Sequence, residues 1–233
     1  MNLVRLMLGM NPLTNSKSIL IAEVSDVHLG HPNTPTTHIL RSLRNIFPDT
    51  ETTAKLDLII IAGDLFDRLL DYNSDDVTDI ELWWIGFVKM CAREKIILRV
   101  LRGTPLHDRD QIERLFALIR GIDVDIDAVY FSELAIERIE ALGLDVLYIP
   151  DEWRHRCDDT WLEVVELMKQ RNLEQVDIVV MHGAFHHQMP KNIHHQLELH
   201  TAERYIKITR RVVYVGHIHQ MSIYENIILA AGS

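Results

Sequence analysis

The chain has 233 residues, which fits one large domain or two small ones and is long enough to bury a hydrophobic core. Its composition, with 47% hydrophobic and 25% charged residues, is ordinary for a globular protein. The formal net charge of −10 argues against a stand-alone DNA-binding module, because no global basic field attracts nucleic acid.

Residues 1–17 are interpreted as an N-terminal extension, because a mildly apolar start is followed by a polar stretch without the cleavage pattern of a signal peptide. After them, short apolar and β-branched runs alternate with longer amphipathic stretches. The apolar runs predict strands that are buried on both faces of a sheet. They cover residues 19–24, 56–62, 95–101, 176–181 and 211–215.

The amphipathic stretches predict helices. They cover residues 36–47, 77–93, 110–120 and 158–171. The strongest is 77–93, which has acidic residues near its start and basic residues near its end, as the helix dipole favours. Two short β-like runs, 134–139 and 144–149, are joined near Gly143 and predict a hairpin. The sequence contains no internal repeat, low-complexity segment or linker.

Each predicted long strand ends in a short cluster of glycine, aspartate or histidine. The clusters are Asp26 and His28, Gly63 and Asp64, Gly103 with His107 and Asp108, His182 and Gly183, and Gly216 with His217 and His219. In open α/β sheets, ligands bind outside the carboxyl ends of the strands. Capping and turn residues would explain any one cluster, but hardly all of them in this order. We therefore expect the clusters to form one site.

Four motifs resemble those of the calcineurin-like metallophosphoesterases: SDVHLG at residues 25–30, GDLFD at 63–67, HG at 182–183 and GHIH at 216–219. Within this superfamily, the SDxHLG and GDLFD patterns look most similar to those of SbcD-type double-strand-break repair DNA nucleases. The resemblance covers residues ~18 to 233. It implies an α/β fold, a four-layer α/β/β/α sandwich with two mixed sheets, in which 18–233 form the catalytic domain.

The resemblance implies two divalent cations about 3.5–4 Å apart, which activate water and compensate charge on the phosphoryl oxygens. The matching motifs supply six ligands: Asp26, His28, Asp64, His182, His217 and His219. By this match Asp64 bridges the cations, Asp26, His28 and His219 complete the first shell, and the other two histidines bind the second cation. Mixed imidazole and carboxylate ligands suit manganese, iron or zinc better than calcium. The resemblance favours manganese.

His107 is the candidate catalytic residue. The family places a histidine beside the second cation, where it contacts the scissile phosphate or protonates the leaving oxygen, and an imidazole titrates near working pH. Asp108 is expected to orient it. The family's third motif reads Gly-Asn-His-Asp or Gly-Asn-His-Glu, with the asparagine as a ligand, whereas this chain has GTPLHD at 103–108. The Thr104 hydroxyl, a backbone carbonyl or water could replace it, so we expect a weaker second site.

Several residues allow two interpretations. Asp67 could support a ligand or cap a helix, and Arg102 could contact phosphate or lie exposed. Trp83 and Trp84 are expected in the core or an interface rather than stacked on nucleic acid. A histidine-rich stretch could face the substrate or form a solvated loop and helix start. Its members are His186, His187, His194, His195 and His200.

The sequence predicts a metal-dependent phosphodiesterase, and the closer resemblance implies a DNA nuclease. Such an enzyme would act with an SMC-like ATPase and form a homodimer, and bound cations would offset the negative charge of the chain. The alternative is a phosphatase or phosphodiesterase acting on a nucleotide, small molecule or phosphoprotein, which the net charge of −10 favours. A binding protein with a degraded metal site is a third interpretation, supported only by the changed third motif.

The two cysteines, Cys91 and Cys157, match neither a zinc-ligand spacing nor a disulfide framework, which predicts a reducing, cytoplasmic location. No apolar run reaches the roughly 18 residues of a membrane span. The chain stops at Gly232-Ser233, where SbcD-type nucleases continue into a smaller capping domain. We therefore expect a catalytic core, either naturally short or cut from a longer protein.

Overall fold

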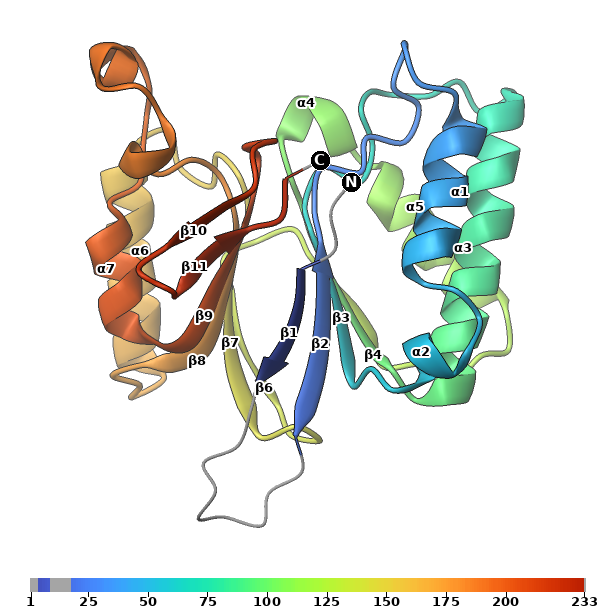
Figure 1. Ribbon diagram of the computed structural model, residues 1–233, viewed down its shortest axis with the longest axis horizontal. Helices are drawn as coiled ribbons and strands as arrows, with labels where there is room; N and C mark the ends of the chain where they lie inside the picture. The colour runs from blue at the N-terminus through green and yellow to red at the C-terminus, as the bar shows by residue number, and fades with distance from the viewer. Residues whose placement is uncertain (1–3, 9–17, 233) are drawn as a thin grey trace.

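The computed structural model of the chain describes residues 4–8 and 18–232, which form two β-sheets packed face to face. Helices cover the outer face of each sheet, so the layers follow the order α/β/β/α (Figure 1). Each sheet contains both parallel and antiparallel strand pairs. The predicted four-layer sandwich with two mixed sheets is confirmed.

The first sheet contains β1 (Val4–Leu8), β2 (Ile19–Val24), β3 (Leu58–Ala62), β4 (Ile97–Leu101) and β5 (Ala128–Phe131). These strands lie in chain order across the sheet. Strands β2 to β5 are parallel, whereas β1 pairs antiparallel with β2. Of the predicted N-terminal extension, the segment that forms β1 is described, and the rest lies outside the described residues.

The second sheet contains β6 (Ala135–Ile139), β7 (Leu144–Ile149), β8 (Val176–His182), β9 (Thr209–Gly216), β10 (Ser222–Tyr224) and β11 (Ile228–Ala230). Their order across the sheet is β10-β11-β9-β8-β7-β6. The four inner strands are parallel, and β6 and β10 are antiparallel edge strands. The predicted hairpin is confirmed, because β6 and β7 pair with Ala135 opposite Tyr148.

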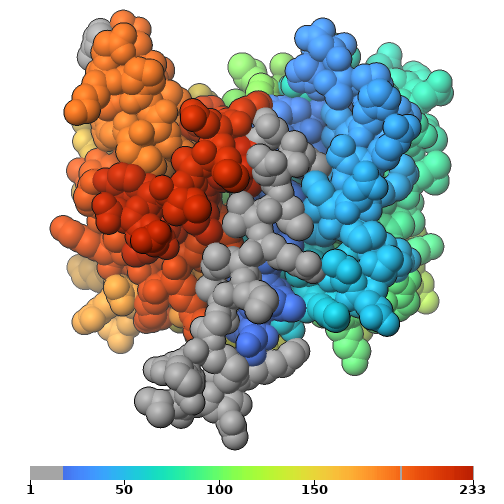
Figure 2. All heavy atoms as spheres, viewed as in Figure 1, coloured from blue at the N-terminus to red at the C-terminus, as the bar shows by residue number. Residues whose placement is uncertain are grey.

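The helices are α1 (Thr36–Ile46), α2 (Glu51–Ala54), α3 (Asp75–Glu94), α4 (Pro105–Asp108), α5 (Gln111–Gly121), α6 (Cys157–Gln170) and α7 (Ala202–Ile208). Two 3-10 helices, η1 (His186–Gln188) and η2 (Lys191–Gln196), lie in a projecting segment. Helices α1, α3 and α5 cover the first sheet, and α6 and α7 cover the second (Figure 1). The two flanks lie on opposite sides of the space-filling view, blue to cyan and orange to red (Figure 2).

Strand β3 shows why the long strands are continuously apolar. All five of its residues are buried. Ile59 and Ile61 pack in the core beneath the helices, whereas Leu58 and Ile60 pack in the core between the two sheets. Because successive side chains of a strand point to opposite faces, a strand with a layer on each side must be apolar at every position.

Helix α3 supplies much of the core beneath the first sheet. It begins at the N-cap Ser74, whose side chain accepts a hydrogen bond from the Val77 backbone. Trp83 and Trp84 are 6% and 0% exposed, and the indole of Trp84 donates to a backbone carbonyl of α5, which confirms their predicted place in the core. Leu82 is exposed on the same helix. The homodimer that the resemblance implies stays a prediction.

The helices of the described residues are also informative about membranes. None of them is long and apolar enough to cross a lipid bilayer.

Candidate metal centre

Polar side chains gather where the carboxyl ends of strands from both sheets meet. Asp26 and His28 follow β2, Asp64 follows β3, and His182 is the last residue of β8. His217 and His219 follow β9. These six residues and His107 fall into three overlapping groups. In each group, one donor atom of every residue lies within 4.8 Å of the donor atoms of the others. All six predicted ligands are therefore brought together.

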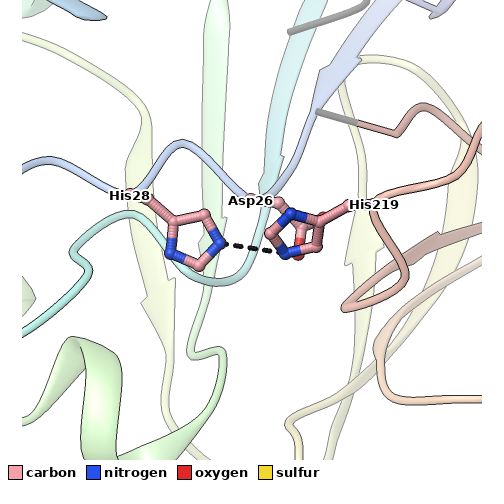
Figure 3. Close-up of side chains that lie close together, drawn as sticks. All are labelled: Asp26, His28 and His219. Carbon is pink, nitrogen blue, oxygen red and sulfur yellow. Dashed lines mark hydrogen bonds and ion pairs between the residues drawn. The ribbon is translucent and has the colours of Figure 1, made fainter. Parts of the chain in front are cut away.

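The first group consists of Asp26, His28 and His219 (Figure 3). The Nε2 atoms of the two histidines lie 3.2 Å apart, and Nε2 of His219 lies 3.6 Å from Oδ1 of Asp26. Burial lowers the pKa of His28, which favours the neutral imidazole that binds metals. Three donors thus converge from two loops that are 191 residues apart in the chain.

The second group consists of Asp64, His182 and His217. The Nδ1–H of His182 donates to the Ala62 carbonyl oxygen at 2.8 Å, which fixes the tautomer and turns Nε2 toward Asp64 Oδ2 at 3.3 Å. This Nε2 is fully buried and has no hydrogen-bond partner of good geometry among the described residues. Burial lowers the pKa of His182, but the charge of Asp64 outweighs this effect and raises it to about 10. The carboxylate of Asp64 thus stabilises a positive charge on or beside the His182 ring.

Asp64 lies at the centre of the cluster. It belongs to the second group and also to a third, with His28 and His107. Its Oδ2 accepts a hydrogen bond from His107 Nδ1 at 2.9 Å, and its Oδ1 accepts one from the Thr104 backbone N–H at 2.6 Å. Burial raises the pKa of Asp64, but its interactions with His182, Thr104 and His107 outweigh that effect and hold the pKa below its ordinary value. An ionised carboxylate in this position suits the bridging role.

Asp108 does not orient His107, and that expectation is wrong. The Asp108 carboxylate is 0% exposed and accepts hydrogen bonds from the backbone N–H groups of Phe66 at 3.0 Å and Gly103 at 2.7 Å. Burial raises its pKa to about 6. Adjacent residues of a helical turn point in different directions, so His107 turns to the site while Asp108 turns inward. Asp108 therefore ties the loop after β4 to the loop after β3.

Thr104 occupies the position where the family has its asparagine. Its hydroxyl lies 3.3 Å from Asp64 Oδ2, and its backbone N–H bonds the other oxygen of the same carboxylate. The hydroxyl is therefore within the cluster, as one of the sequence-based alternatives required. The threonine side chain is shorter than that of asparagine and offers a hydroxyl in place of an amide oxygen. The weaker second site stays a prediction.

The backbone at the site is locally strained. Four of the six predicted ligands have positive φ angles: Asp26 (53°), His28 (54°), Asp64 (49°) and His217 (97°). Non-glycine residues rarely adopt this region, and such residues cluster at functional sites. Gly63 and Gly216 make room for His182, because a Cβ atom on either would lie 2.3 and 2.6 Å, respectively, from its Nδ1. These glycines explain the Gly-Asp and Gly-His pairs of the sequence.

Asp67 lies beside a predicted ligand rather than at the start of a helix. Its Oδ1 lies 3.3 Å from Nδ1 of His28, the nitrogen that does not face His219. A carboxylate behind a metal-binding histidine sets the orientation of the ring. Arg102 is half-buried rather than exposed.

Neither interpretation describes the whole histidine-rich stretch. His186 is exposed on η1, whereas His187 is half-buried and stacks on Tyr224 with ring centroids 4.0 Å apart. His200 is 8% exposed, and its Nδ1 lies 2.9 Å from the Tyr205 hydroxyl. Burial lowers the pKa of His200 to about 4. The side chain of His195 lies outside the described residues.

The sequence reasoning missed Asp151. This residue follows β7, and its Oδ2 lies 3.9 Å from Nδ1 of His217. The available signal was the one used for the other clusters, since Pro150-Asp151 also comes directly after a buried apolar run.

The donors fit divalent cations. Imidazole nitrogens and carboxylate oxygens together suit transition metals, and the buried Nε2 of His182 gains a partner when a cation is present. The fold and this set of donors define a metallophosphoesterase. A family model described as calcineurin-like phosphoesterase matches residues 19–221, and the chain belongs to this family. Its chemistry is metal-dependent hydrolysis of phosphate esters. A search of curated proteins found no match.

Proposed function

We propose that this protein is a phosphodiesterase that cleaves DNA, in the manner of SbcD-type nucleases. The observation that carries the proposal is a hollow on each side of the metal centre. One, of about 290 Å³, is lined by Asp26, His28 and His219 and extends along the start of α1. The other, of about 470 Å³, is lined by His217 and the loop after β7. A phosphodiester has a substituent on each side of its phosphorus, and a monoester has one.

The motifs of the resemblance also form one physical unit, which supports the comparison with SbcD-type nucleases. The loop 25–30 runs beside the loop 63–67. The backbone N–H of His28 donates to the Asp64 carbonyl at 3.0 Å, and that of Asp67 donates to the Leu29 carbonyl at 3.0 Å. Through these bonds GDLFD positions the residues of SDVHLG, and the Asp67 carboxylate lies 3.3 Å from His28 Nδ1.

We propose Asp26, His28, Asp64 and His219 as the residues that hold the first cation, and His182 and His217, with Asp64, as those that hold the second. Manganese is the proposed metal, with iron or zinc as the other candidates. When bound, divalent cations compensate the charge of the phosphoryl oxygens and activate water at neutral pH.

We propose that His107 acts on the substrate. Its Nδ1 is held by Asp64, which leaves Nε2 as the atom that can meet a leaving oxygen, and the side chain is 36% exposed. Its proton on Nε2 would pass to the leaving oxygen as the ester bond breaks. The ring is held in place by Asp64 rather than by Asp108.

Replacing His107 with glutamine should lower kcat for a phosphodiester by about 10²–10⁴-fold, because general acid catalysis contributes this much. Bound metal should remain near the wild-type amount, since the other donors are unchanged. Steady-state kinetics and elemental analysis of the purified variant would measure both. His186→Gln, which changes an exposed histidine of η1, is the matched control. Normal turnover in the His107 variant would show that the assigned role is wrong.

The substrate proposal is tested by incubating the chain and Mn²⁺ with labelled single- and double-stranded DNA, a bis-aryl phosphodiester and a phosphomonoester. We expect cleavage of DNA and of the diester, and loss of both with chelator. The alternative is a phosphoesterase acting on a nucleotide or small molecule, which the net charge of −10 favours because DNA binding draws on phosphate neutralisation. Activity confined to small esters would contradict the nuclease and support this alternative.

A further inference from the structure

Three neighbouring strands of the second sheet end at the metal centre. β7, β8 and β9 are adjacent and parallel (Figure 1). His182 ends β8 and His217 follows β9, while Asp151 follows β7 after a single proline. Parallel strands bring their carboxyl ends to the same edge of a sheet. Asp151 therefore stands in line with two predicted ligands.

Asp151 is a nearly buried carboxylate without a lysine or arginine partner among the described residues. The residue is 9% exposed. Its nearest ionisable neighbour is His217, at 3.9 Å, and among the described residues no lysine, arginine or hydrogen-bond donor pairs with it. Burying a carboxylate is costly unless it is paired or binds a metal.

Asp177 shows how this protein treats a carboxylate of similar burial. Asp177 is 7% exposed, and its oxygens accept hydrogen bonds from Arg211 Nε at 3.2 Å and from the Asp145 backbone N–H at 3.0 Å. Arg210 lies at 3.6 Å. Among the described residues, Asp151 has neither the arginine neighbours nor the backbone hydrogen bond that Asp177 has, and only His217 lies within ion-pair distance of it. Asp151 instead lines the hollow beside His217, where a bound cation would compensate its charge.

The second cation site needs an oxygen donor. Its candidates are Asp64, His182 and His217, of which Asp64 also faces the first group. The loop after β4 has Thr104 in the place of the family's asparagine. Two ligands of one cation, each about 2.1 Å from it, lie about 3–4 Å apart, and the distance of 3.9 Å between Asp151 Oδ2 and His217 Nδ1 falls in this interval. Asp151 lies outside the three groups whose donor atoms are all within 4.8 Å of one another, so its side chain has to turn toward Asp64 and His182 to bind the same cation.

We propose that Asp151 is an oxygen ligand of the second divalent cation. It reaches the cation from the second sheet, beside His217, and supplies the donor that the loop after β4 lacks. Because the ligand is anionic, it also offsets the charge of a divalent cation more than a neutral asparagine does. This inference rests on the proposed function, since it requires the two-cation site.

The test is the binding of Mn²⁺ to the full chain, measured by titration calorimetry and elemental analysis, with electron paramagnetic resonance to detect coupled manganese pairs. Wild type should bind two ions. Asp151→Ala should retain the more tightly bound ion. Its affinity for the other ion should fall by more than the roughly 10–100-fold that loss of a residue behind a metal ligand causes. Its coupled-pair signal should be lost at stoichiometric Mn²⁺. Asp151→Asn, which keeps an oxygen donor without the charge, should fall between the two.

Glu152→Gln is the matched control, because Glu152 is an exposed neighbour that lines the same hollow. It should bind both ions like wild type. Circular dichroism and thermal unfolding of each variant establish that it is folded, and Asp151→Asn serves if the alanine variant is not. Two ions bound with wild-type affinity in a folded Asp151 variant overturn the inference alone. One ion in a wild type that still cleaves DNA does the same, whereas a wild type that binds none overturns the proposed function as well.

Discussion

Replacing Asp64 with asparagine is expected to lower phosphodiester hydrolysis by at least about 10³-fold. Stabilisation of transition-state charge by bound cations amounts to several kcal/mol, and each 1.36 kcal/mol changes the rate tenfold. Asp64 is the residue on which the most contacts converge, since the described donors His182, His107 and Thr104 all meet its carboxylate. Asparagine keeps the shape of the side chain but removes its charge.

The same change should weaken the binding of both cations, because Asp64 lies between the two groups of ligands. kcat/KM for the bis-aryl diester and metal content by elemental analysis are the two measurements. Asp125→Asn, an exposed carboxylate in the loop before β5, is the control and should leave both unchanged. An Asp64 variant that retains its metals and its rate would contradict the bridging role.

Replacing Arg99 with methionine should destabilise the protein by roughly 1.5–3 kcal/mol, because it removes hydrogen bonds to a charged group from the half-buried Glu137. Arg99 lies on β4 and is 2% exposed. Its guanidinium donates to Glu137 of β6 at 2.6 and 2.8 Å and lies 2.8 Å from Asp127 Oδ1. The Tyr148 hydroxyl donates to the same glutamate at 3.1 Å. Arg99 thus joins the two sheets through charge.

The free energy of unfolding in urea would measure this effect. Arg138→Met is the control, because Arg138 is 46% exposed and pairs with Asp145 on the surface, where such a pair is worth at most about 1 kcal/mol. Methionine in place of Arg99 leaves Glu137 without its partner, so the additional change Glu137→Leu should restore part of the loss. An Arg99 variant as stable as wild type would show that water replaces the ion pair at little cost.

The long buried strands and helices could be predicted because the pattern of apolar residues along the chain indicates them. The continuous apolar run of β3, which ends at Ala62, and the helical spacing of apolar residues in α3 are visible in the sequence alone. Short strands were missed. β10 and β11 have only three residues each, and their pairing in the sheet, not their own composition, makes them strands.

Candidate ligands could be named for the same reason. A residue such as Asp64 or His182 at the carboxyl end of a buried strand has its place set by that strand, and the order of such residues carries the resemblance to the family. The role of Asp108 could not be assigned. Its partners Phe66 and Gly103 belong to two loops after different strands, so their distances depend on how those strands align.

The sequence by itself determined that this chain is an α/β protein with Asp and His clusters at the ends of its long strands, because burial and turn chemistry act over a few neighbouring residues. Only the tertiary structure decided which of these side chains meet. His28 faces His219 across 191 residues, and Asp151 stands beside His217 because β7, β8 and β9 lie next to one another. Such distances depend on the packing of two sheets against each other, which no local pattern records.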